Sequence, residues 1–191
     1  MELRSNASTE WLEATQLSFQ YHKTLADRAI AQVSDAALHQ AIDAETNSIA
    51  AIVQHLSGNL ASRWTDFLTT DGEKPTRDRD REFDDANASR AELLAAWEGA
   101  WSQLFASLSA LVPDDFQRTV MIRGEAHSIP LAIQRSLAHA SYHIGQIVLL
   151  ARHWAGDQWT TLTIPRGGSA AHNAAAWSSD DYARRGERPK N

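Results

Sequence analysis

Apolar residues recur every three to four positions over four long parts of the chain, and this spacing predicts four amphipathic helices. The expected helices cover about 9–33, 48–68, 89–112 and 130–154. Candidate N-caps for the first three are Ser8 or Thr9, Asn47 or Ser48, and Asn87 or Ser89. Pro113 stops the third helix, and Pro130 fits the first turn of the fourth. Four helices of this length predict an all-α four-helix bundle.

The segments between these helices carry weaker signals. Residues 36–40 predict a short helical turn, and the charged stretch 69–86, broken by Asp71-Gly72 and Pro75, predicts a solvated loop. Two short β-enriched runs, 119–122 and 127–129, flank a glycine turn and predict a small hairpin before the last helix.

The C-terminal part is expected to be a tail rather than a second domain. It begins with apolar residues at Trp159 and is predicted to be ordered as far as Ile164 or Arg166. From residue 178 onward charge and Pro189 favour fraying. We therefore expect one domain over 1–177 and a frayed tail over 178–191.

The last predicted helix has more apolar residues than one face needs. Leu131, Leu149 and Leu150 lie outside its main apolar arc. This excess predicts burial on two sides, by the tail or by a second subunit, and favours a homodimer.

Charge and composition exclude several classes of protein. The net charge of −6 argues against a nucleic-acid-binding protein. Neither a signal peptide nor an apolar run of membrane-spanning length occurs, so a cytoplasmic location and no membrane partner are expected. The chain has no cysteine, so any metal must be bound by histidine, carboxylate or water. No nucleophile elbow or phosphate-binding glycine loop is present.

His139 and His143 are four residues apart in the last predicted helix. Residues at this spacing lie on one face, one turn apart, so the two imidazoles can reach a single metal ion. The alternative is a pair of ordinary histidines at the bundle surface.

A third ligand cannot be chosen from spacing alone. His55 lies mid-helix beside a stripe of small polar residues, where the wall of a cleft is expected, and could equally be a hydrogen-bonded, half-buried histidine. The remaining candidates are His22, His39, His127, His153 and His172. None of them has a partner at ligand spacing.

Two arginines are candidates for binding an anionic group. Arg63 falls near the apolar arc two turns after His55, where it either binds an anion near the metal or extends past Trp64 to water. Arg166, in Pro-Arg-Gly-Gly, allows the same pair of interpretations. The interior glycine Gly58 indicates close packing or close ligand approach, and Tyr142 is expected to pack away from the histidine pair.

Five blocks of sequence resemble the DinB-like superfamily, also called the DinB/YfiT-like metalloenzymes, and in particular an uncharacterised bacterial branch of it. The resemblance covers roughly residues 10–170. The blocks are 47–60, 63–74, 118–125, 137–147 and 163–167.

The resemblance implies a bundle of up-down-down-up type with one long connection. It also implies a divalent metal ion, zinc or nickel, held by three histidines that correspond here to His55, His139 and His143. Three protein ligands leave an open coordination position, which is the pattern of catalytic rather than structural zinc.

Two functions follow as hypotheses. The first is a metal-dependent thiol S-transferase or hydrolase that acts on a small molecule through metal-bound water or thiolate, with a low-molecular-weight thiol as its candidate partner. The second is a non-catalytic, stress-associated metal-binding bundle protein.

Overall fold

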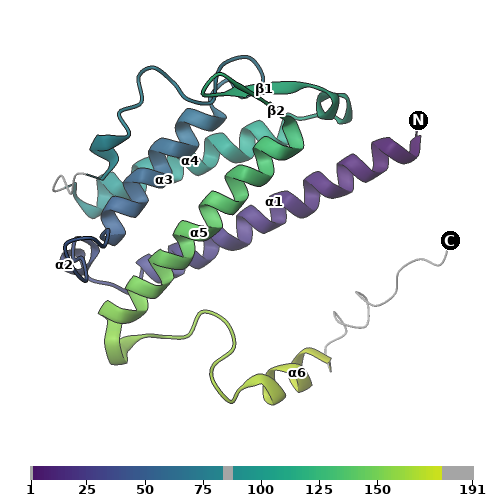
Figure 1. Ribbon diagram of the computed structural model, residues 1–191. Helices are drawn as coiled ribbons and strands as arrows, with labels where there is room; N and C mark the ends of the chain where they lie inside the picture. Colours follow the sequence, from purple (N-terminus) through teal and green to yellow (C-terminus); the bar gives the residue numbers. More distant parts are fainter. Residues whose placement is uncertain (1, 84–87, 178–191) are drawn as a thin grey trace. The chain divides into compact units, whose positions relative to one another are not determined.

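The computed structural model describes residues 2–83 and 88–177. The chain divides into two units, one ending at Gln158 and one beginning at Trp159. The first unit contains four long helices, which are α1 (Glu2–Ile30), α3 (Ile49–Trp64), α4 (Arg90–Ser109) and α5 (Ile129–Ala155). Figure 1 shows them side by side as a bundle, with a small hairpin before α5. The predicted fold class is confirmed.

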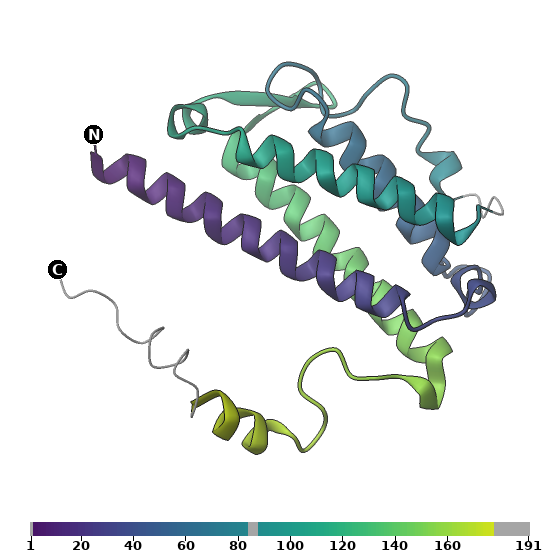
Figure 2. The same ribbon diagram turned by 180° about the vertical axis from the view of Figure 1, so that it is seen from behind.

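The helices follow an up-down-down-up order, as the resemblance implies. α1 and α5 run one way and α3 and α4 run the other, which can be followed from both sides in Figures 1 and 2. The C-terminal ends of α3 and α4 lie together, since the carbonyl of Trp64 accepts hydrogen bonds from Gln103 and Ser107. A long connection therefore has to return the chain between these two parallel helices.

Serine caps fix where four of the described helices begin, and Ser128 is the cap of α5. The hydroxyl of Ser48 accepts the backbone N–H of Ala51, and Ser89 forms a capping box with Glu92. Ser34 caps the short helix α2 (Asp35–Leu38) in the same way. The predicted caps Ser48 and Ser89 are thus confirmed, whereas the alternative Asn87 lies outside the described residues.

Several predicted helix boundaries are wrong. α1 runs straight through Ser8 and Thr9, because the preceding residues contain no proline or glycine to stop it. α3 ends at Trp64, about one turn before the predicted end. Asp66 then adopts a positive φ of 49°, which an α-helix does not allow.

The connection between α4 and α5 contains the 3₁₀ helix η2 (Pro113–Gln117) and the hairpin, β1 (Thr119–Ile122) and β2 (Glu125–Ser128). The strands are antiparallel, with Ile122 opposite Glu125. Arg123 and Gly124 both have positive φ, as a two-residue type I′ turn requires. The second strand therefore begins two residues earlier than predicted.

Asp71 ties the connection after α3 to this hairpin turn. Its carboxylate accepts the backbone N–H groups of Glu73, Arg123 and Gly124, all within 2.8 Å. These backbone hydrogen bonds, together with the charge of nearby Arg63, hold the pKa of Asp71 below its ordinary value although burial acts the other way. The carboxylate thus holds the hairpin in place while it is ionised.

We expect Asp71→Ala to reduce the free energy of unfolding by about 1–2 kcal/mol at pH 7. A carboxyl group whose pKa is lower in the folded state stabilises the protein at pH values above its unfolded-state pKa. This stabilisation is lost as the pH falls through the folded-state pKa. The difference between wild type and variant should therefore shrink below about pH 4 in urea titrations. Asp78→Ala is the control, because the side chain of Asp78 is largely exposed. An Asp71→Ala deficit that persists unchanged in acid would contradict this role.

The excess apolar residues of α5 divide into two groups. Leu150 is buried in the bundle, whereas Leu131 and Leu149 are 55% and 66% exposed. Leu150 therefore needs no partner outside the described core. For Leu131 and Leu149, burial in a homodimer interface stays a prediction.

The second unit contains a helix that was not predicted. After an irregular stretch from Trp159, α6 covers Ser169–Trp177. Its run of alanines, which have the highest helix propensity, explains the helix. The predicted domain boundary at 177 stays a prediction, and the predicted frayed tail over 178–191 lies outside the described residues. Of the helices that the structure describes, none combines the length and apolar character needed to span a membrane.

Candidate metal centre

Three histidines converge between α3 and α5. His55 comes from α3, and His139 and His143 come from successive turns of α5. One candidate ligand nitrogen from each ring lies within 4.8 Å of the other two. His55 and His143 are buried, and His139 is partly buried. Of the sequence candidates for a third ligand, the structure brings His55 to the pair.

Hydrogen bonds fix the orientation of two of these rings. Nδ1 of His55 donates to the Glu82 carboxylate at 2.9 Å, and Nδ1 of His143 donates to the Gln146 side-chain oxygen at 2.7 Å. The Gln146 amide in turn donates to the hydroxyl of Tyr142. Because Nδ1 carries the proton in both rings, their Nε2 atoms keep a free lone pair in the neutral state.

The ring of His139 keeps one nitrogen without a hydrogen-bond partner among the described residues. Nε2 of His139 lies 3.2 Å from Nε2 of His55, and the buried Nδ1 of His139 has no hydrogen-bond partner among the described residues. Buried polar atoms are seldom left unpaired. Three imidazoles that turn ring nitrogens toward one another are therefore well suited to sharing a cation.

Burial favours the neutral form of the two histidines on α5. Burial lowers the pKa of His139 to about 4, and the charges of His143 and His55 act in the same direction. Burial also lowers the pKa of His143, against the hydrogen bond to Gln146. Neutral imidazole is the form that binds a metal, so this environment favours ligation at neutral pH.

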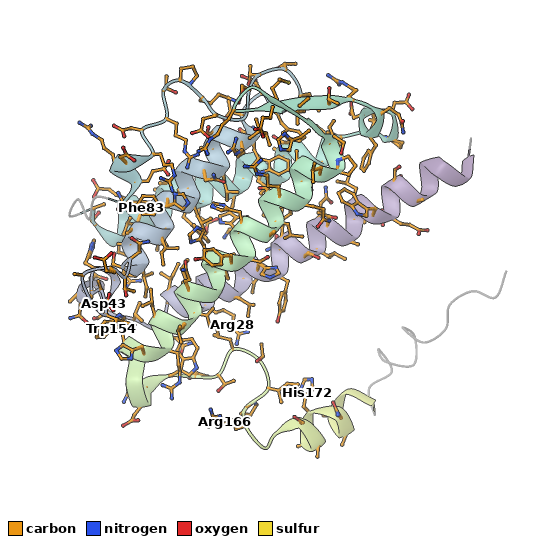
Figure 3. All side chains as sticks on the ribbon, viewed as in Figure 1. Arg28, Asp43, Phe83, Trp154, Arg166 and His172 are labelled. Carbon is orange, nitrogen blue, oxygen red and sulfur yellow. The ribbon has the colours of Figure 1, made fainter. Side chains whose placement is uncertain are left out.

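The connection between α3 and α4 supplies the groups behind His55. Glu82, at the end of the 3₁₀ helix η1 (Asp80–Glu82), accepts from His55 and is held by Arg77 through two 2.7 Å hydrogen bonds. The ring of Phe83, labelled in Figure 3, stacks on the His55 ring at 4.5 Å. The prediction of a solvated loop is wrong for this part, since the side chains of Arg77 and Glu82 are only 4% and 10% exposed.

Sequence reasoning missed these groups because the connection has no periodicity from which contacts could be inferred. The prediction does hold for Asp78 and Arg81, whose side chains are mostly exposed. The one signal available was Phe83, an aromatic residue in a charged run.

Gly58 makes room for Glu82. A Cβ atom on Gly58 would lie within 3 Å of the Glu82 carboxyl group, a distance that side chains do not tolerate. The close packing indicated by this interior glycine is confirmed. A side chain here would force Glu82 away from His55.

The three histidines line one part of a cavity of about 450 Å³. The wall also includes Asn59, Arg63 and Trp64 from α3, and residues 120–123 of the hairpin. Tyr142 lines the cavity too and makes an edge contact with His143 at 4.8 Å, so the expectation that it packs away from the histidines is wrong. The cavity gives a small molecule access to the cluster.

The two predicted anion-binding arginines lie in different units. Arg63 lines the cavity and pairs with Glu73 at 3.2 Å, and its side chain is only 12% exposed. It does not extend to water as the alternative interpretation proposed. Arg166 precedes α6 in the second unit (Figure 3), and its part in substrate binding stays a prediction.

The other candidate ligands lie elsewhere in the fold. His22 binds the carbonyl of Ser18 within α1, and His153 contacts the ring of Trp154 near the end of α5. His127 of β2 accepts from Arg135, His39 directly follows α2, and His172 is in α6. The four of these histidines that belong to the first unit do not join the three-histidine cluster.

The fold and the cluster define a helical-bundle protein with three histidines that could hold a metal ion. The chain belongs to the family described as "Protein of unknown function (DUF1572)", whose model matches residues 6–168. Searches of curated proteins and of solved structures found no match.

Proposed function

We propose that this protein is a DinB-like metalloenzyme that uses a divalent cation, zinc or nickel, for thiol S-transfer or hydrolysis of a small molecule. The observation that supports it most strongly is the convergence of His55, His139 and His143 on the wall of a 450 Å³ cavity. A structural metal would need no such cavity beside it.

The residues present fit a divalent cation. The hydrogen bonds from Nδ1 of His55 and His143 leave Nε2 of each ring free to coordinate, and a carboxylate behind a ligating histidine is a common arrangement in metal sites. A bound cation would supply Lewis acidity, which lowers the pKa of a coordinated water or thiol. The chain contributes the orientation of the imidazoles and a partly apolar chamber for the substrate.

Metal analysis of protein purified without a histidine tag tests the binding step. We expect close to one equivalent of zinc or nickel in the wild type and in His22→Ala, which removes a bundle histidine outside the cluster. His55→Ala should lose it. Equal metal content in His55→Ala and wild type would refute the site.

Activity is tested separately with the metal-loaded protein. Incubation with cysteine and an alkylating electrophile, and in parallel with a carboxylic ester, reports thiol loss or acid release. Either reaction, if lost in His55→Ala, supports an enzyme. A fully loaded protein that is inactive with both, and whose fourth ligand comes from the chain, would instead favour a non-catalytic metal-binding protein.

Gly58→Ala should weaken metal binding about ten- to hundredfold, because displacing the carboxylate behind a ligand has effects of that size. Gly99→Ala is the matched control, since a Cβ atom there would meet no atom within 4 Å. It should leave metal affinity unchanged and stabilise α4 by up to about 1 kcal/mol. Competition with a chromophoric zinc chelator measures the affinity, and equal affinities for the two variants would contradict the role of Glu82.

A further inference from the structure

The cavity wall is strongly cationic although the chain is acidic overall. Five of the described lining residues are arginines, and none is aspartate or glutamate. The arginines are Arg63, Arg77, Arg79, Arg123 and Arg135. In a chain with a net charge of −6 this distribution is the reverse of what composition alone would give.

The carboxylates behind the wall do not balance these charges. Glu82 is committed to Arg77 and His55. The single carboxylate of Glu73 is shared among Arg63, Arg77 and Arg123, with a nitrogen–oxygen distance of 3.2 Å in each case. Arg135 has a histidine, His127, as its partner, and no described carboxylate pairs with it. Positive charge is therefore left over beside the cavity.

Arg63 is the least satisfied of the group. Its Nη1 is buried with no hydrogen-bond partner in the described part of the chain, while its Nη2 pairs with Glu73. Burial lowers the pKa of Arg63, and the positive charges of Arg77, Arg123 and Arg135 act in the same direction, against the attraction of Glu73. One nitrogen of this guanidinium group, Nη1, therefore lacks an acceptor.

The helices place these arginines at a definite distance from the histidines. His55, Asn59 and Arg63 follow one another at one-turn intervals on α3, so Arg63 is about 12 Å along the axis from His55. On α5, Arg135 precedes His139 by one turn, or about 6 Å. Because α3 and α5 are antiparallel, both arginines are displaced from the histidines toward the hairpin, which carries Arg123.

Apart from the arginines and histidines, the cavity wall is mainly apolar. It includes Phe67, Val120, Ile122 and Ala132, with Asn59 and Ser136 as neutral polar groups. A ligand that fills the cavity therefore meets Arg63, Arg123 and Arg135 toward the hairpin and the imidazoles farther along α3 and α5, with apolar side chains on the same wall.

We propose that the cavity binds small molecules with an oxyanion head group, a carboxylate or a phosphate, at an arginine subsite formed by Arg63, Arg123 and Arg135. The head group supplies the acceptor that Nη1 of Arg63 lacks, and charge-assisted bonds to guanidinium groups are among the stronger hydrogen bonds in proteins. The reactive part of the molecule then lies about 6–12 Å away, at the histidines. The location of the reaction rests on the proposed function, but the anion subsite does not.

Isothermal titration of the chelator-treated, full-length protein at low chloride tests the subsite without metal. The probes are butyrate, its neutral counterpart butyramide, and inorganic phosphate. We expect butyrate or phosphate to bind and butyramide not to bind. Arg63→Gln and Arg135→Gln should each weaken binding about tenfold, and Arg81→Gln, an exposed arginine outside the cavity, should not.

The exposed side chain of Arg135 makes Arg135→Gln informative even where replacing the buried Arg63 disturbs folding. Equal binding of butyrate and butyramide, or equal anion affinity in Arg135→Gln and Arg81→Gln, would overturn the subsite. His55→Ala separates the two proposals. If His55→Ala still binds the anion, the arginine subsite is supported, whatever the metal content of the variant. If the folded variant no longer binds the anion, the anion lies at the histidines and the arginine subsite is overturned.

Discussion

Replacing Arg77 with methionine should destabilise the metal-free protein by about 3 kcal/mol at pH 7, because breaking a buried ion pair leaves an uncompensated charge. The side chain of Arg77 is 4% exposed and donates to both oxygens of Glu82 and to Glu73. Without it, Glu82 is left nearly buried beside His55. We expect the lower end of the usual 3–5 kcal/mol, since Glu82 keeps its hydrogen bond with His55.

The same reasoning sets the pH dependence of this loss. Burial tends to raise the pKa of Glu82, but the hydrogen bonds from His55 and Arg77 outweigh it and lower the pKa. A lowered carboxyl pKa stabilises the folded state at pH values above the unfolded-state pKa. The stabilisation is lost as the pH falls through the folded-state pKa. The Arg77→Met deficit should thus be greatest at neutral pH and shrink below about pH 4.5.

Urea unfolding of three variants measures these effects. Arg81→Met, which removes an exposed arginine of the same connection, should change the free energy of unfolding by less than about 0.5 kcal/mol. Adding Glu82→Gln to Arg77→Met should recover part of the loss, because it removes the unpaired charge. An Arg77→Met deficit no larger than that of Arg81→Met would show that this pair does not stabilise the fold.

How much of this site was predictable depends on the kind of geometry involved. The His139–His143 pair follows from helix periodicity alone, because residues four apart always share a face. The choice of His55 as their neighbour depends on how α3 packs on α5, which the spacing of a single sequence does not contain. The family resemblance selected it, and the structure brings it to the pair.

The groups behind His55 depend on a connection without regular structure. Arg77 and Glu82 look like two charges in a hydrophilic run, and only the folded chain turns them inward against α3. The missed helix α6 is a different case, since its alanines carry propensity but little amphipathic pattern. Periodic contacts were therefore accessible from sequence, and contacts made by irregular segments were not.

Trp64 connects the core of the bundle to the cavity, and Trp64→Ala should destabilise the protein by about 3–5 kcal/mol. Its side chain is 1% exposed. The ring contacts Phe19 of α1, its Nε1–H donates to Ser136 of α5, and its carbonyl accepts from Ser107 of α4. Truncation therefore opens a void between α1, α3 and α5, and the void joins the cavity that Trp64 lines.

Trp64→Phe is the matched comparison. It keeps an aromatic ring against Phe19 and loses mainly the hydrogen bond to Ser136, so about 1–2 kcal/mol is expected. Thermal and urea unfolding measure both variants, and zinc titration at low temperature measures the site in the fraction that remains folded. Because Trp64 makes no ring contact or hydrogen bond with the three histidines, zinc affinity should stay within a few-fold of wild type. A loss under 1 kcal/mol for Trp64→Ala would mean that the helices close over the void, and that the cavity owes its shape to other residues.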